Sequence, residues 1–278
     1  MRRWIALFAV CLPLLASEAA LAGGYVPNLL DKLTAISDKT GIIGGFPGTQ
    51  ISSGSTSTSF RHHLHISTLT GTYNPQLVYS CSYVMNAGED SACPNAMTIK
   101  AVLGYNGVNY PVSIGGTTGS YSLGIGATVI SDPIGVTIPA GSDVYICTYV
   151  TVASGGWPLG RALASATGGE GSSGTNGADD TGACAAGTGM TSGGYSFGPM
   201  AIVGHPLLRG QKAIGLVGDS ICAGSGDAYN TATGVAGYLE RALGNSTGDC
   251  QEFRVWAGPV EHCQAAARLN RSAKRTAN

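Results

Sequence analysis

Charged residues are scarce in this sequence, at 11% of 278 residues, and the formal net charge is only −1. Nucleic-acid binding depends on a basic surface, so this balance argues against nucleic acid as a partner. Aromatic residues are also few, at 7%, whereas glycine reaches 43 residues. Hydrophobic residues still make up 44% of the chain, which excludes a chain disordered throughout. Abundant glycine beside Thr, Ser and Val favours β structure with tight turns.

The sequence also lacks an uninterrupted apolar run of the ~18 residues that a transmembrane helix needs. The nearest candidate is the shorter run Trp4–Leu15, which follows Arg2 and Arg3 and precedes an Ala20-Leu21-Ala22 cleavage pattern. A positive start, a short apolar segment and an A-x-A site are typical of a secretory signal. We therefore predict a signal peptide at residues 1–22 and a secreted or periplasmic mature chain without stable membrane insertion. An uncleaved anchor is the alternative.

No two cysteines have C-x-x-C spacing, which argues against a zinc ribbon or a thioredoxin-like site. Of the eight cysteines, Cys11 lies in the predicted signal and seven remain. An oxidising compartment permits disulfides, and the odd number leaves one thiol over or paired between chains. Cys81 and Cys147 both lie in strand-like runs, so we expect a bridge between them, although sequence alone does not fix connectivity.

Short strand-like segments with regular turns occupy residues 60–152. "MTIKAVLGYNGVNYPVSI" predicts a hairpin that turns at Asn106-Gly107, and "IGVTIPAGSDVYICTYVTV" predicts a strand, a Pro-Ala-Gly turn and another strand. This pattern predicts an antiparallel, jelly-roll-like β-sandwich over residues 23–164. Within it, the apolar spacing in residues 28–36 predicts a short helix with Asn28 as N-cap.

Residues 165–211 are predicted to be a Gly/Ser-rich loop followed by a returning strand and connector. The stretch 165–194 has almost no large apolar side chain, which is typical of a flexible loop or linker. Asp179-Asp180 within it is interpreted as a solvated acidic turn rather than a metal site, because other oxygen ligands are not spaced nearby. "YSFGPMAIVG" either closes the sandwich or leads into the next domain.

The pattern changes to α/β in residues 212–258. Ala213–Val217 is a short apolar run, as in a strand buried on both faces of a parallel sheet. Apolar residues then recur at helical spacing between Val235 and Leu243, and Gly244 is a natural stop. "FRVWAG" is a candidate second strand. A strand, a Ser-containing loop and a helix are the usual opening of an α/β domain.

The segment "GLVGDSICAG" resembles the first sequence block of the SGNH/GDSL hydrolases, which are mostly esterases, lipases and carbohydrate deacetylases. The resemblance implies a flavodoxin-like domain behind a jelly-roll-like partner and needs no metal or organic cofactor. It makes Ser220 the nucleophile and an oxyanion donor through its own N–H, with Asp219 ordering the turn. Gly258 is the candidate second-block glycine. Cys222 occupies the second glycine position of G-x-S-x-G, which disfavours an ordinary α/β-hydrolase elbow.

The later blocks of that family are not found in this chain. No Gly-x-Asn-Asp follows Ser220, and the only histidine after it is His262, with Pro259 where the family has Asp. Residues 259–278 form a basic, Ala-rich tail. We therefore expect a truncated or frameshifted hydrolase domain that is weakly active or inactive.

The sequence thus predicts an exported hydrolase that acts on carboxylic esters, of small molecules or linked to polysaccharide, through Ser220. The alternative is a non-catalytic β-sandwich that binds carbohydrate or a cell surface and carries a vestigial hydrolase stub. Trp157, Tyr105 and Tyr110 are its candidate sugar-stacking residues, although core or edge positions are the favoured interpretation. Whether the chain is an enzyme, and its oligomeric state, stay open.

"RHHLH" is the remaining candidate for a site. Strand alternation puts His63 and His65 on one face and His62 on the other. Two imidazoles at this spacing can share a metal ion, but the sequence offers no third ligand. Polar strand residues are the favoured interpretation.

Overall fold

A computed structural model describes residues 33–36, 54–66, 70–84, 90–154, 156–159, 169–208, 213–216 and 251–254. Apart from one 3₁₀ turn, η1 (Thr181–Ala183), every regular element of these residues is a β-strand. Most of the strands form two antiparallel sheets that share one hydrophobic core. The β-sandwich predicted from sequence is therefore confirmed for the described part of the chain.

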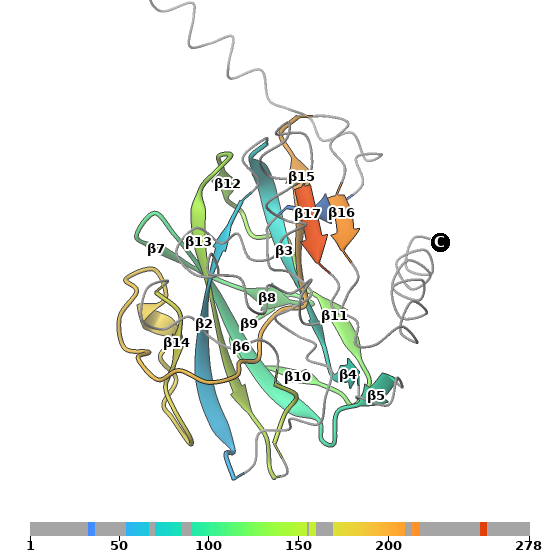
Figure 1. The fold of residues 1–278 in the computed structure, drawn as a ribbon, viewed down its shortest axis with the longest axis vertical. Coiled ribbons are helices and arrows are strands. Elements are labelled where there is room, and N and C mark those ends of the chain that lie inside the picture. The colour runs from blue at the N-terminus through green and yellow to red at the C-terminus, as the bar shows by residue number, and fades with distance from the viewer. Residues whose placement is uncertain are drawn as a thin grey trace, which may run out of the picture. The chain divides into compact units, whose positions relative to one another are not determined.

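The chain passes several times between the two sheets (Figure 1). The first sheet has the order β1 (Thr34–Ala35), β15 (Ala201–Pro206), β3 (Thr72–Ser80) and β11 (Thr128–Ile130), with β12 (Thr137–Ile138) also paired to β3. The second has the order β10 (Tyr121–Leu123), β6 (Met97–Tyr105), β13 (Asp143–Thr151), β2 (Ser57–His65) and β14 (Gly171–Ser172), with β7 (Val108–Pro111) paired to β6.

Three short pairs complete the described strands. Antiparallel pairs join β4 (Ser82–Val84) to β5 (Asp90–Ala92) and β8 (Ser113–Ile114) to β9 (Thr117–Thr118). The third pair, β16 (Ala213–Leu216) with β17 (Gln251–Arg254), is parallel. It is the one parallel pairing among the described strands.

The core lies between the inner faces of the two sheets. Leu77 and Tyr79 of β3, Leu103 of β6 and Ile146 of β13 all belong to this core cluster, and all four are buried. The Tyr79 hydroxyl and the Thr148 hydroxyl lie 2.7 Å apart and join the two sheets by a hydrogen bond. Burial raises the pKa of the Tyr79 phenol, so this group stays neutral and remains available as a donor.

Two predicted turns take the predicted form. Asn106 and Gly107 have φ angles of 48° and 74°, and they join β6 to β7 with Tyr105 opposite Val108. This is the positive-φ pair that a tight hairpin needs, and Asn and Gly adopt it at little cost. The Pro-Ala-Gly turn links β12 in the first sheet to β13 in the second, so it carries the chain from one layer to the other.

The helix predicted for residues 28–36 is wrong where the structure describes this segment. Thr34 and Ala35 form β1, opposite Gly204 and Val203 of β15, and Ile36 is buried in the core. An open sheet edge and a core site for Ile36 outweigh a helical pattern of only nine residues. The returning strand predicted within residues 165–211 is β15. It pairs with β3 and so belongs to the sandwich.

The expected Cys81–Cys147 bridge is wrong as well, because Cys147 forms a disulfide with Cys184. On β13, the even positions such as Ile146 face the core, whereas Cys147 faces outward with Val102. Cys81 belongs to the core cluster. Successive strand residues point to opposite faces, so Cys147 lies on the outer face of the second sheet, whereas Cys81 lies in the core between the two sheets.

A search of the described residues found no helix with the length and apolar character needed to cross a bilayer.

Candidate functional site

Ser220, Asp219 and Gly258, the three residues predicted to form the hydrolase site, lie outside the described residues, as does the predicted signal peptide. The structure describes the strand that precedes each part of this site. Leu216 ends β16 and Arg254 ends β17, and these two residues are register partners in the parallel pair. Parallel pairing puts the carboxyl ends of both strands at one sheet edge, where ligands of open α/β sheets bind.

The best-defined polar constellation of the described residues lies instead on the outer face of the second sheet. It is made by residues Gly169–Ser192, here called the covering segment, which the sequence predicted to be part of a flexible loop or linker. The segment contributes β14, which pairs with β2, and η1, and it carries Cys184 of the disulfide. The structure differs from the prediction because polar contacts and one disulfide, rather than large apolar side chains, hold this segment in place.

Side chains of several strands bind the backbone of the covering segment. The Ser59 hydroxyl of β2 donates to the carbonyl of Ala178 and accepts from the N–H of Asp180, both at 2.9 Å. Asn109 of β7 donates to the carbonyl of Gly182 and accepts from the N–H of Ala185. These side-chain bonds satisfy backbone groups of the covering segment at the surface of the sheet and fix its path across the strands.

Close backbone approach also explains two of the many glycines. A Cβ on Gly171 would lie 2.0 Å from the carbonyl oxygen of Met190, and one on Gly104 would lie 2.8 Å from the backbone of Ala185. Real Cβ atoms do not approach backbone that closely, so the covering segment can lie flat only where side chains are absent. Small residues here are a packing requirement rather than a sign of a linker.

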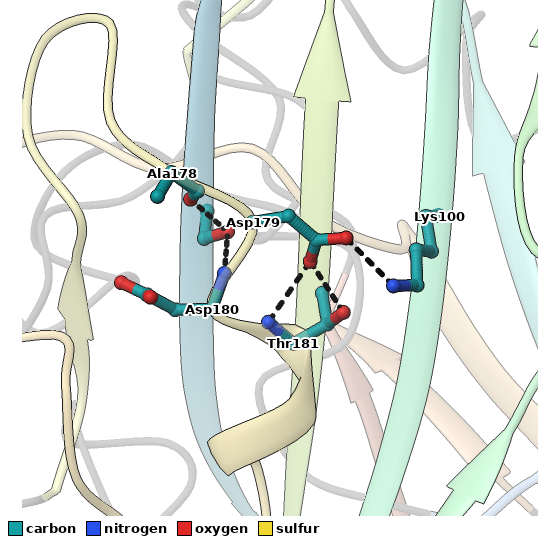
Figure 2. Close-up of polar contacts among 6 residues, drawn as sticks. Lys100, Ala178, Asp179, Asp180 and Thr181 are labelled. Carbon is teal, nitrogen blue, oxygen red and sulfur yellow. Dashed lines mark hydrogen bonds and ion pairs between the residues drawn. The ribbon is translucent and has the colours of Figure 1, made fainter.

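Asp179 of this segment forms an ion pair with Lys100 of β6, as Figure 2 shows. One carboxylate oxygen accepts from Lys100 Nζ at 2.6 Å, and the other accepts from the N–H and the hydroxyl of Thr181. Burial alone would raise the pKa of Asp179, but these hydrogen bonds from Lys100 and Thr181 lower it below its usual value. The acidic pair is therefore a local anchor, with the carboxylate of Asp180 directed away from Lys100 (Figure 2).

We expect Asp179→Asn to lower the free energy of unfolding by about 0.5–1 kcal/mol at pH 7, because this ion pair is partly exposed and screened. The pKa of Asp179 is lowered in the folded state. Its contribution is therefore present above the unfolded pKa of about 4 and is lost as the pH falls through the lower folded value. Urea unfolding at pH 7 and at about pH 2–3 measures the difference between wild type and variant, which should shrink in acid. Asp180→Asn is the matched control, and an equal loss in both variants contradicts the assignment.

Arg61 of β2 holds the two ends of the covering segment. Its guanidinium donates to the carbonyl of Gly169 through Nε, to Thr188 at 2.7 Å and to Met190 at 3.4 Å. Burial lowers the pKa of Arg61, an effect that nearby Tyr145 opposes. Arg61 is only 3% exposed, so its donors face carbonyls rather than an incoming anion. The arrangement is that of a structural clamp.

The histidine strand joins the same outer face. His63 Nε2 lies 3.6 Å from a carboxylate oxygen of Asp143, and its ring stacks on Tyr145 with centroids 4.8 Å apart. The backbone N–H of His63 donates to Glu170, whose side chain is buried. His62 is fully buried and lies on the opposite face of β2 from His63, and this alternation is as predicted. The side chain of His65 lies outside the described set. No cluster of three metal-ligating side chains was found in the described part of the chain.

Two of the charged residues that matter most on this face, Arg61 and Glu170, were not candidates in the sequence analysis. The available signal was the placement of Arg61 in "FRHHLH", where alternation pairs it with the outward histidines rather than with the core. Glu170 gave no signal, because it follows Gly168-Gly169 in a stretch whose composition resembles a linker.

The aromatic residues considered for sugar stacking are core or edge residues. Trp157 is 1% exposed and meets Phe60 edge-to-face at 6.3 Å, and Tyr105 and Tyr110 pack partly buried against the same core. The covering segment crosses the outer face of the second sheet. Neither a protein-family model nor a curated protein matches this chain.

Proposed function

We propose that this protein is an exported ester hydrolase of the SGNH type, with Ser220 as nucleophile and a jelly-roll-like β-sandwich as partner domain. The observation that supports it most is the parallel pairing of β16 with β17. The family resemblance at "GLVGDSICAG" requires a strand before the serine and a second, parallel strand beside it. Both strands occur in the described chain, outside the two antiparallel sheets of the sandwich.

The register of this pair supports the proposal that Ser220 and Gly258 belong to one site. Ser220 and Gly258 each lie four positions beyond a residue of the Leu216–Arg254 register pair. Four residues extend at most about 14 Å, and paired strands are about 4.8 Å apart. Residues that leave one sheet edge at matched positions can therefore meet, as a nucleophile and an oxyanion-donating glycine must.

The length and sequence of the connection between the strands also support the proposal. Parallel strands need a crossover of at least about a dozen residues, usually a helix. Between Leu216 and Gln251 lie 34 residues, and they include the segment Val235–Leu243 with its helical apolar spacing. A right-handed β-α-β crossover directs the N-terminus of the helix towards the carboxyl end of β16. The partial positive charge there favours a developing oxyanion at Ser220.

Catalysis by a serine hydroxyl needs a base, and this is where the chain departs from the family. His262 is the only histidine after Ser220, and Pro259 stands where the orienting Asp would be. We therefore expect slow turnover that depends on Ser220, with ester substrates whose leaving group needs little activation.

The test is hydrolysis of a short-chain aryl ester by the exported protein beside Ser220→Ala and Ser225→Ala. We expect Ser220→Ala to reduce the rate at least about 10-fold, to the buffer background, because the acyl group loses its acceptor oxygen. Ser225→Ala, a neighbouring serine with no family role, should keep the wild-type rate. Equal background rates in all three proteins would remove the enzyme proposal and direct attention to polysaccharide binding.

A further inference from the structure

Two cysteines of the sandwich, Cys81 and Cys93, are thiols in this structure although they lie beside each other in its core. Cys81 directly follows β3 and precedes β4, whereas Cys93 directly follows β5. The β4–β5 register, with Ser82 opposite Ala92, continues by one step to place Cys81 opposite Cys93. The N–H of Cys93 donates to the carbonyl of Cys81 at 2.9 Å, which holds the two backbones together at this point.

The side chains meet as well. Both residues are buried, with 0% and 2% of their surface exposed, and both belong to the same core cluster. The Cys81 thiol donates to the carbonyl of Asn95 at 3.4 Å, and the two thiols are close enough that each shifts the pKa of the other. Opposed residues of an antiparallel pair have Cβ atoms about 4.5–5.5 Å apart, and a disulfide needs about 3.5–4.5 Å. A small adjustment therefore suffices for a bond.

We propose that Cys81 and Cys93 form a second disulfide in the exported protein, closing the β4–β5 hairpin at its base. The proposal does not depend on Ser220 being catalytic. It also reduces the odd set of seven mature cysteines to Cys222, Cys250 and Cys263, since Cys147 and Cys184 are already bonded.

The chemistry balances as thiol–disulfide exchange with an oxidising disulfide, either of a small thiol or of an oxidoreductase. The Cys81 thiolate attacks one sulfur of the oxidant, forming a mixed disulfide and releasing one thiolate. Cys93 then loses its proton and attacks the Cys81 sulfur, which releases the second thiolate. Two electrons pass to the oxidant and two protons leave the protein. Because both thiols end buried, the exchange precedes the final packing of the hairpin.

In the packed hairpin the two thiols influence each other. The Cys93 thiol lowers the pKa of the Cys81 thiol, against the opposing effect of burial. The Cys81 thiol, together with burial, raises the pKa of Cys93. Before packing both thiols are accessible, so the order in which they attack is interchangeable.

Peptide mapping of the full exported chain tests the proposal. Free thiols are blocked with iodoacetamide in denaturant without reductant, and the protein is digested with trypsin. No Lys or Arg lies between Arg61 and Lys100, so one peptide, residues 62–100, contains both cysteines. We expect it to be unalkylated and two hydrogens lighter than its reduced form. Cleavage after Glu89 should then leave its two halves joined until reductant is added.

The internal positive control is the known bridge, which joins the separate tryptic peptides 101–161 and 162–209 through Cys147 and Cys184. The matched variant is Cys93→Ala, in which Cys81 has lost its partner and should be alkylated whether or not the variant folds. Alkylation of both cysteines in the wild-type peptide overturns the proposal. Linkage of either one to a peptide with Cys222, Cys250 or Cys263 overturns it too.

Discussion

Truncating Trp157 to alanine is expected to lower the free energy of unfolding by about 3–5 kcal/mol, the usual cost of removing a large aromatic side chain from a packed core. Trp157 is 1% exposed and is among the largest fully buried side chains of the described residues. Its ring meets Phe60 of β2 edge-to-face, so the truncation leaves a cavity and removes an aromatic pair. Equilibrium unfolding in urea measures the loss.

Leu208→Ala is the surface control, because Leu208 is 55% exposed and its truncation should change stability by less than about 0.5 kcal/mol. The same pair of variants separates the two interpretations of Trp157. If Trp157 stacked on a sugar, Trp157→Ala would weaken polysaccharide binding and leave stability nearly unchanged, which would contradict the core assignment.

The sandwich was predictable where local chemistry and tertiary packing agree. Asn106-Gly107 specifies a tight hairpin by itself, since few other dipeptides adopt two successive positive φ angles. Inward positions of β6 such as Met97, Ile99 and Leu103 are apolar and buried, which fits the register of the hairpin. The helix expected at residues 28–36 failed because the decisive partners, β15 and the core around Ile36, are distant in sequence.

The covering segment differs most from the prediction, because its Gly/Ser-rich composition resembles that of a flexible linker. Its stabilising contacts are side-chain hydrogen bonds from Ser59 and Arg61, an ion pair from Lys100 and one disulfide, all made by residues of other strands. None of these partners can be recognised from the Gly/Ser-rich stretch itself. For the candidate site, the sequence supplied only a motif. The pairing of the strands that precede Ser220 and Gly258 joins segments distant in sequence, and the motif does not contain it.

Disulfide pairing also depends on contacts distant in sequence, because it requires two cysteines on the same side of a sheet. Cys147 faces outward on β13, whereas Cys81 lies in the core, so these two residues do not bond. Once the register of β13 is known, strand alternation gives the facing of Cys147. The partner of Cys147 could not, because Cys184 lies in a segment whose path across the sheet is set by contacts with β2, β6 and β7.

Removing the Cys147–Cys184 disulfide, as Cys147→Ala with Cys184→Ala, is expected to lower the free energy of unfolding by about 3–4 kcal/mol. The bond joins residues 37 apart, and closing a loop of that length restricts the unfolded chain by roughly this amount. The loss should be concentrated in the covering segment. Its amides, such as that of Ser172 bonded to Ser192, should exchange hydrogen faster, while those of β6 and β13 keep most of their protection.

Hydrogen exchange of the double variant, measured beside wild type, distinguishes a loss of protection confined to the covering segment from a loss throughout the sandwich. The rest of the anchoring remains in the variant, since Arg61 still binds both ends of the segment and Asp179 still pairs with Lys100. Uniform loss of protection through β6 and β13 would mean that the disulfide supports the sheet itself. A stability change below about 1 kcal/mol would mean that the polar contacts suffice to hold the segment. Either result contradicts the expected division, in which the disulfide holds the segment over a sheet that is stable without it.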